Sequence, residues 1–186
     1  MPYLAEIHQM NGRRNSYEVE VELDVRKLLE SKTSRLFEFQ KNEDKTGYDL
    51  ICNQYTVTPT DWDKQRIGYI EIEEVCSWSG SDVPSNWYCY SFLARKVYKF
   101  NWSDNKWTNE LHDNADSTLY LKVSSDLSGA ICASVNDIVE HGIGKKGKKG
   151  LSQLYNDTYI EIEIGHSSVV TGIDNCVEYI IDFLTL

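Results

Sequence analysis

Three acidic residues are spaced so that a folded sheet could gather them around a divalent cation. The run Gly68–Glu73 alternates acidic and apolar side chains, and alternation along an extended strand puts Glu71 and Glu73 on one face. Asp49 lies 22 positions before Glu71, an interval that suits two antiparallel strands joined by a long turn. If Asp49 sits on the neighbouring strand, three carboxylates converge as a hard cation requires. The spacing therefore indicates metal-dependent, nuclease-like chemistry.

The same alternation of acidic and β-branched residues has a simpler interpretation. It recurs at Glu18–Glu22 and Glu161–Ile164, and glutamate is an ordinary solvent-facing residue on a sheet with one buried and one hydrated face. Under this alternative the carboxylates of all three tracts are solvated. What distinguishes the middle tract is its neighbours, Asp49 before it and Arg95-Lys96 after it.

The surrounding sequence predicts the elements that would position these residues. Alternation on both sides of Asn11-Gly12 predicts a hairpin from Leu4 to Leu23. Asp24 stands where a helix N-cap would, and the apolar spacing after it predicts a helix over Val25–Leu36. Six further segments are predicted to be strands: Tyr48–Tyr55, Ile67–Cys76, Trp87–Phe100, Thr118–Ser124, Gly129–Val135 and Tyr159–Ile164. Residues 175–186 fit either a helix or a strand.

This order of elements resembles the PD-(D/E)XK, or restriction-endonuclease-like, superfamily over roughly residues 24–135. The matching features are a helix, a strand carrying Asp49, a strand carrying Glu71-Ile72-Glu73, and a further strand. The superfamily signature usually ends in lysine, and here Glu73 occupies that position, as glutamate does in some type II restriction enzymes. The resemblance implies an α+β fold with a restriction-endonuclease-like core: a mixed, mostly antiparallel central sheet flanked by helices.

The resemblance also implies roles for individual residues. Asp49 and Glu71 would bind Mg²⁺ or Mn²⁺, and Glu73 would orient or deprotonate the attacking water. Lys96, expected on a neighbouring strand, would stabilise the developing phosphate charge. Glu30, on the predicted helix, would be an accessory acid.

A second group of basic residues is a candidate for binding nucleic acid. The segment Gly142–Gly150 carries four lysines on glycine-rich backbone (Lys145, Lys146, Lys148 and Lys149) but lacks the spacing of a phosphate-binding P-loop. A cationic loop of this kind, together with Arg95, is expected to contact phosphates. A solvated loop without a ligand is the alternative.

Length and charge restrict the class of protein. A chain of 186 residues is expected to form a single domain, with the hairpin and helix in residues 1–40, a nuclease-like core in 41–135 and the basic loop and C-terminal elements in 136–186. A net charge of −10 argues against a coat for long nucleic acid, which needs a basic face. It permits a nuclease with a local basic rim. It also suits the alternative function, a non-enzymatic inhibitor or immunity-type protein that binds a basic protein partner.

Other features predict location and exposure. The chain has no apolar run of roughly 20 residues and no basic and apolar signal-peptide regions at its start, so we expect a soluble, cytoplasmic protein with no membrane partner. The five cysteines form no Cys-x-x-Cys element and are expected to be buried free thiols. Trp78 and Trp87 flank a Gly/Pro loop and are expected to be the most exposed of a dense aromatic group.

Overall fold

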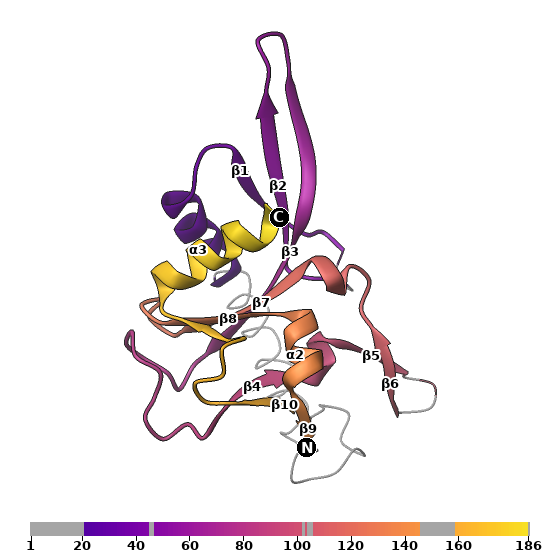
Figure 1. Cartoon of the computed structure of the whole chain (residues 1–186), viewed down its shortest axis with the longest axis vertical. Helices are drawn as coiled ribbons and strands as arrows, with labels where there is room; N and C mark the ends of the chain where they lie inside the picture. Colours follow the sequence, from indigo (N-terminus) through magenta and orange to yellow (C-terminus); the bar gives the residue numbers. More distant parts are fainter. Residues whose placement is uncertain (1–20, 45–46, 102, 104–105, 146–158, 186) are drawn as a thin grey trace, which may run out of the picture.

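A six-stranded sheet forms the centre of the fold (Figure 1). The computed structural model describes residues 21–44, 47–101, 103, 106–145 and 159–185. In spatial order the strands are β1 (Phe37–Lys41), β2 (Leu50–Val57), β3 (Trp62–Val75), β7 (Thr118–Ser124), β8 (Ala130–Ser134) and β11 (Val170–Thr171). Among these described strands only the β3–β7 pair is parallel. The α+β class and the mixed, mostly antiparallel sheet are therefore confirmed.

Smaller elements cover and flank this sheet. A three-stranded sheet has the order β4 (Cys89–Leu93), β10 (Tyr159–Glu163) and β9 (Ile143–Lys145), and a separate hairpin pairs β5 (Tyr98–Asn101) with β6 (Lys106–Leu111). The helical segments are residues 21–32, η1 (Ala94–Lys96), η2 (Ala115–Ser117), α2 (Val135–His141) and α3 (Ile173–Leu184).

One core lies between the six-stranded sheet and two helices. Val25 and Leu29, four residues apart on the helix of residues 21–32, point into it with the Ile180 side of α3, because such spacing shares one helical face. Leu50 of β2 and Ile70 of β3 meet them from the sheet. Both helices lie on one side of the sheet in Figure 1, where α3 contacts β8 and β11.

A second core fills the opposite face of the six-stranded sheet. Phe92 of β4 and Ile162 of β10 pack there against Tyr120 of β7 and Ile138 of α2. Every residue of β7 and β8 is consequently buried. Side chains of β3 and β7 on this face, including Glu71 and Lys122, are held between the two layers.

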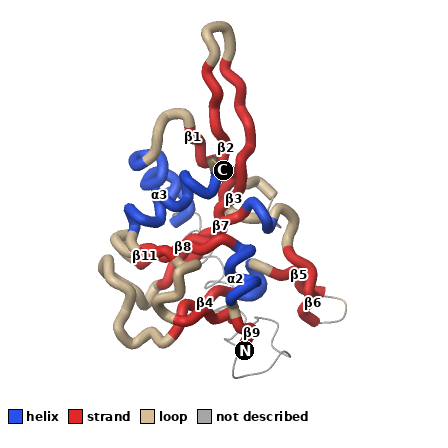
Figure 2. Tube along the Cα trace, in the orientation of Figure 1, coloured by secondary structure: helices blue, strands red, loops and turns tan. Residues whose placement is uncertain are grey.

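The outer part of the β2–β3 hairpin protrudes as an arm (Figure 2), which is two-stranded beyond Gln54, where pairing with β1 ends. The register shifts between Cys52 and Asn53, which pair with Gly68 and Arg66 respectively. Ile67 is therefore an extra residue on β3, a β-bulge of the kind that bends a strand locally. We call residues 53–66 the arm.

Several predicted boundaries differ from the structure. Residues 21–23 are helical, so the predicted hairpin is wrong where it reaches Leu23, and its remainder lies outside the described residues. The helix ends at residue 32, before Leu36, and contains Asp24 instead of starting after it. The predicted strand Trp87–Phe100 is broken by η1, because residues 94–96 turn between β4 and β5. The C-terminal segment is a helix, α3.

The prediction that Trp78 is exposed is wrong. Trp78 is 1% exposed, its indole N–H donates to the Asp82 carbonyl at 2.8 Å, and its ring meets the half-buried Trp87 edge-on. Of the cysteines, Cys52, Cys89, Cys132 and Cys176 are buried free thiols as expected, whereas Cys76 is exposed. The described part of the chain has no helix with the length and apolar content needed to cross a membrane.

Candidate functional site

Asp49 and Glu71 lie side by side at the base of the β2–β3 hairpin. The antiparallel register pairs Leu50 with Ile70, so the residues next in line, Asp49 and Glu71, are opposite each other on the same face. The Asp49 carboxylate accepts a hydrogen bond from the backbone N–H of Ile72 at 2.8 Å. Asp49 thus caps the point where β2 stops pairing with β3, which fixes its carboxylate beside Glu71.

Lys96 reaches this pair from the covering layer. Its ammonium lies 2.5 Å from Glu71 Oε1 and donates to the Ile72 carbonyl at 2.7 Å. Sequence reasoning placed Lys96 on a strand, which is wrong: it ends the short helix η1, whose tight turn after β4 carries the long side chain down onto β3. Only 16% of the Lys96 side chain and 8% of the Glu71 side chain are exposed.

Glu73 lies one pleat further along β3 and has partners of its own. The predicted convergence of three carboxylates is therefore wrong: among the described residues, the group of three potential ligands within 4.8 Å of one another lies on α2 and does not include Asp49, Glu71 or Glu73. The Tyr120 hydroxyl donates to its carboxylate, and Lys122 Nζ lies 3.6 Å from it. Lys122 also donates to the Ser91 carbonyl at 2.5 Å. The β3–β7 register pairs Glu71 with Tyr120 and Glu73 with Lys122, so these four side chains form one buried row between the layers.

Burial shapes the protonation of this row. It raises the pKa of Glu71 to about 7, and the nearby Asp49 carboxylate adds to the rise against the opposing effect of Lys96. Burial alone would lower the pKa of Lys96, but attraction to Glu71 and Asp49 outweighs it, so the pKa of Lys96 is raised. For Lys122 burial prevails, and its pKa is lowered. The charged side chains of the site therefore interact strongly with one another and are poorly solvated.

Sequence reasoning missed Glu22, which belongs to the same charged region. Its pKa is raised by partial burial and by repulsion from Asp49, so the two carboxylates are neighbours. Glu30, the accessory acid expected on this helix, is exposed. Glu22 has helical spacing to Val25 and Leu29 on the core face. Because the hairpin predicted from Leu4 to Leu23 made Glu22 part of a strand, this spacing was not used.

Lys122 was also missed, although Tyr120 and Lys122 alternate with apolar residues in a strand that was predicted with the right bounds. The other predicted basic residues are only partly placed. Arg95 is exposed on η1 and close enough to lower the pKa of Glu71 in part. Lys145 ends β9, and the remaining loop lysines (Lys146, Lys148 and Lys149) lie outside the described residues, as do Glu18 and Glu20.

The third acidic tract, on β10, provides an internal comparison. Glu161 accepts a hydrogen bond from the exposed Tyr88 hydroxyl at 3.2 Å, and Glu163 is exposed. These residues share the alternation of Glu71 and Glu73 but lie on a hydrated surface. The tertiary setting, and not the local pattern, sets the middle tract apart.

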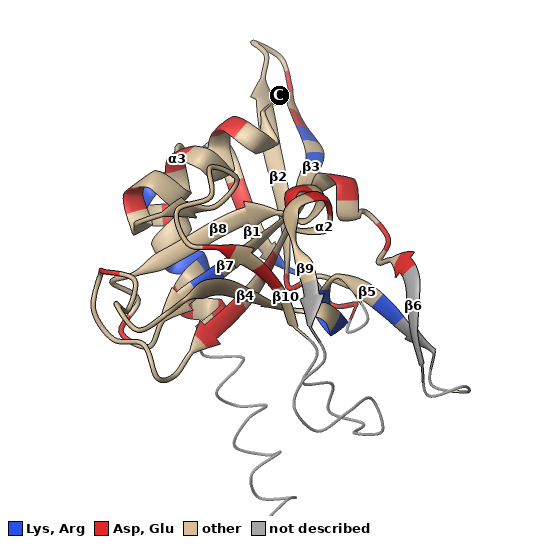
Figure 3. Ribbon diagram, turned by 60° about the horizontal axis from the view of Figure 1, so that its bottom comes forward, with Lys and Arg blue, Asp and Glu red and all other residues tan. Residues whose placement is uncertain are grey.

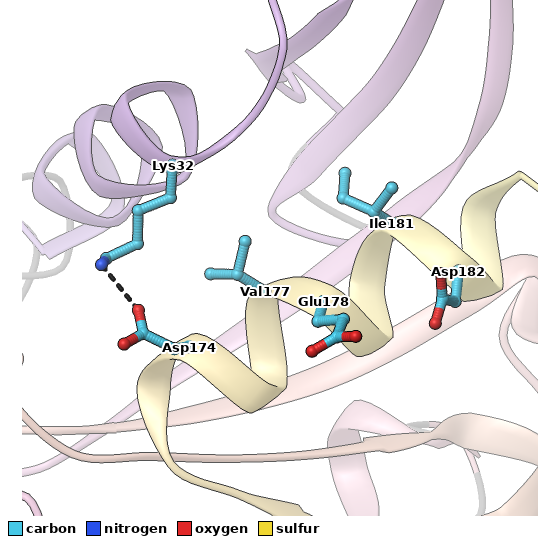
Figure 4. A pocket seen from close by; sticks show the side chains of 6 residues that line it. All are labelled: Lys32, Asp174, Val177, Glu178, Ile181 and Asp182. Atoms are coloured by element: carbon cyan, nitrogen blue, oxygen red, sulfur yellow. Dashed lines mark hydrogen bonds and ion pairs between the residues drawn. The ribbon is translucent and has the colours of Figure 1, made fainter.

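Two other surface features lie away from this row. Asp137, Glu140 and His141 of α2 have potential ligand atoms within 4.8 Å of one another, but Glu140 and His141 are exposed, and such exposed clusters are common without a metal. An open depression beside α3 is lined by Lys32, Asp174 and neighbouring residues (Figure 4). The ion pair between Lys32 and Asp174, at 2.7 Å, joins the two core helices across it, which is a structural role.

No protein-family model, curated protein or solved structure matches the chain. Carboxylates and a carbonyl oxygen surround one ammonium at the junction of β2, β3 and η1, and a second acid–lysine–tyrosine group adjoins it.

Proposed function

We propose that the protein is a metal-dependent phosphodiesterase acting on nucleic acid, built on a restriction-endonuclease-like core. The observation that carries this proposal is the position of the Lys96 ammonium. It is held by the Glu71 carboxylate and the Ile72 carbonyl, directly beside Asp49. A fold that gathers these oxygens around one positive charge offers the donors that a divalent cation uses.

The donor set fits Mg²⁺ or Mn²⁺. Both ions prefer oxygen ligands, and Mg²⁺ is usually held by one or two carboxylates while keeping several waters. Asp49 and Glu71 supply two carboxylates and Ile72 a carbonyl. The ammonium of Lys96 stands in for the cation among these oxygens.

The residues divide the catalytic work between them. Asp49 and Glu71 would hold the metal, which would supply Lewis-acid chemistry by neutralising phosphate charge and lowering the pKa of a water. Glu73 orients the attacking water or accepts its proton, and its hydrogen bond from Tyr120 keeps the carboxylate in place. Lys96, released from Glu71, and the exposed Arg95 stabilise the phosphate charge as it develops.

A thermal-shift experiment with Mg²⁺ and Mn²⁺ tests the metal site. An ion that binds only the native state stabilises it by about 2.7 kcal/mol at 100 times its Kd, which for a chain of this size raises Tm by roughly 5–10 °C. Glu71→Gln and Asp49→Asn should abolish the rise. Glu163→Gln, on the exposed tract of β10, should leave it unchanged. Cleavage of DNA or RNA should require the metal and disappear in the first two variants.

The second candidate is the non-enzymatic interaction protein that binds a basic partner. It is favoured by one observation: Glu71 and Glu73 already have lysine partners inside the protein, so each of these carboxylates has a positive partner without a metal. A wild-type protein with neither a metal-dependent Tm rise nor cleavage would contradict the enzyme and select this candidate, in keeping with the net charge of −10.

A further inference from the structure

The sheet face that carries Asp49 and Glu71 continues onto the arm. Val57 pairs with Trp62, Tyr55 with Lys64, and Asn53 with Arg66. These pairs share a face, because Glu38 of β1 bonds Asn53, Tyr55 and Lys64 alike.

The bulge at Ile67 keeps this face continuous with the candidate site. Ile67 packs into the first core, and a side chain at Gly68 would run into Leu184 of that core. Arg66 instead lies over the Tyr69 ring, with 5.6 Å between the guanidinium carbon and the ring centroid. Tyr69 is two residues from Glu71 and shares its face. A single row therefore leads from Trp62 through Lys64 and Arg66 to Glu71.

This row, which we call the arm track (Tyr55, Trp62, Lys64 and Arg66), combines aromatic rings with cations. Trp62 is 65% exposed and meets the half-buried Tyr55 ring edge-on at 6.2 Å, which leaves indole surface open to solvent. Lys64 and Arg66 are exposed, and basic segments of β3 are visible along the arm in Figure 3.

The opposite face of the arm has a different chemistry. It carries Thr56, Asp63 and Gln65, because alternate residues of each strand point that way. Neither an aromatic ring nor a cation of the described residues lies among them. The two faces share strand pairing and exposure, so a ligand that reads aromatic and cationic groups would use only the arm track.

We propose that the arm track binds unpaired nucleic acid and leads it toward Asp49 and Glu71. The choice of nucleic acid as ligand rests on the proposed function, and it gives that function a substrate class: single-stranded DNA or RNA. An exposed tryptophan stacks on any base whose face is free, and bases inside a duplex offer no such face. Two cations are too few to hold a duplex against a net charge of −10, because duplex affinity depends on neutralising many phosphates.

The length of the track suits several nucleotides. The arm track runs from Trp62 to Arg66, four residues or about 14 Å at about 3.4 Å per residue, and Glu71 lies five residues further along β3, one of which is the bulge residue Ile67. Glu38 lowers the affinity of Lys64 for phosphate, because its carboxylate lies 2.7 Å from Lys64 Nζ and competes with a phosphate for that ammonium.

Fluorescence anisotropy with labelled oligo-dT and oligo-U tests the proposal. The protein carries Glu71→Gln throughout and is kept in EDTA, so that binding is measured without cleavage and without metal. We expect both oligonucleotides to bind more tightly than a duplex of equal length. Trp62→Ala should weaken binding roughly 5- to 150-fold, the range for one base–aromatic stack.

Salt dependence separates the cations from the aromatic rings. The two phosphate contacts of the arm track should contribute about −1.4 to the slope of log K against log[salt], and Arg66→Ala should flatten the slope by about 0.7. Glu38→Gln should strengthen binding, because it frees Lys64. Thr56→Ala and Gln65→Ala, on the opposite face of the arm, are the matched controls and should change neither affinity nor slope. Equal Tm values of Trp62→Ala, Arg66→Ala and the two controls, all at exposed positions, verify folding.

Three results would overturn the proposal. One is unchanged affinity in both Trp62→Ala and Arg66→Ala; another is equal loss in the control variants. The third is no binding to any oligonucleotide. If Trp62 then mediates self-association, measured by sedimentation, the arm is a protein interface. Failure of the metal site is detected separately by the thermal shift. If the protein binds oligonucleotides through the arm track but shows no thermal shift with metal, the arm-track proposal stands and the proposed enzymatic function is wrong.

Discussion

Lys96 and a divalent cation cannot use the same oxygens of Glu71 and Ile72 at once. The ammonium contacts both at hydrogen-bond distance, so a metal that takes these ligands must displace it. Without a metal, Lys96 opposes the burial and the repulsion from Asp49 that together raise the pKa of Glu71. Lys96 thus stabilises the protein without metal and competes with the ion for the same oxygens.

Lys96→Met should separate these two effects. Removing one partner of a buried ion pair costs about 3–5 kcal/mol, so the Tm of the metal-free variant should fall. Its Mn²⁺ affinity, measured by isothermal titration calorimetry, should rise, because the competing ammonium is gone. Lys122→Met is the control: it also loses a buried partner, that of Glu73, but should leave the Mn²⁺ affinity unchanged. Weaker Mn²⁺ binding in Lys96→Met would contradict the competition.

At the scale of elements, β3 is the strand on which the site depends. It pairs with β2 on one side and in parallel with β7 on the other, and its inner part lies between two cores. Gly68 marks the point where the buried part begins. A Cβ there would lie 2.5 Å from Leu184 Cδ2 of α3 and 2.5 Å from the Ser117 carbonyl of η2. The close approach of both helical segments to β3 requires glycine.

Gly68→Ala should therefore destabilise the fold without altering the chemistry of the site. Overpacking of this kind costs about 1–3 kcal/mol, and urea unfolding would measure it. Thr56→Ala, exposed on the arm, should stay within about 0.5 kcal/mol of the wild type. The rise of Tm with Mn²⁺ should persist in Gly68→Ala. Wild-type stability in this variant would show that α3 and η2 do not press on β3.

At the scale of the whole molecule, the protein is acidic but carries exposed basic residues on η1 and the arm. The protein has a net charge of −10, yet Arg95 of η1 and the arm cations Lys64 and Arg66 are exposed. Local cations of this kind can steer phosphate despite an acidic protein. The segment over residues 142–150 carries four further lysines.

Replacing Lys145, Lys146, Lys148 and Lys149 together by alanine tests that segment. If its lysines contact phosphates, the affinity for nucleic acid should fall and the salt slope should flatten by up to about 0.9 per lost contact on duplex DNA, or about 0.7 on a single strand. Arg66→Ala in the same binding assay gives the change expected for one contact. A slope equal to that of the parent protein would assign the four lysines to solvation.

The local pattern of the sequence was sufficient for the strands and their faces. Two-residue alternation predicted Thr118–Ser124 with its observed bounds and the shared face of Glu71 and Glu73, because the direction of side chains in a strand is a property of the backbone itself. The interval from Asp49 to Glu71 similarly suited the antiparallel pair that β2 and β3 form. These features depend on residues close together along the chain or on one hairpin.

What the sequence could not determine is which distant side chains meet this face. Lys96 contacts Glu71 because a short helix after β4 turns it downward, and Lys122 contacts Glu73 because β7 pairs with β3 in parallel across more than forty intervening residues. Glu22 approaches Asp49 only because its segment is a helix. Burial then decides the pKa values, since the same Glu-Ile-Glu pattern is solvated on β10 and enclosed on β3. Such contacts follow from packing of the whole chain, which local periodicity does not encode.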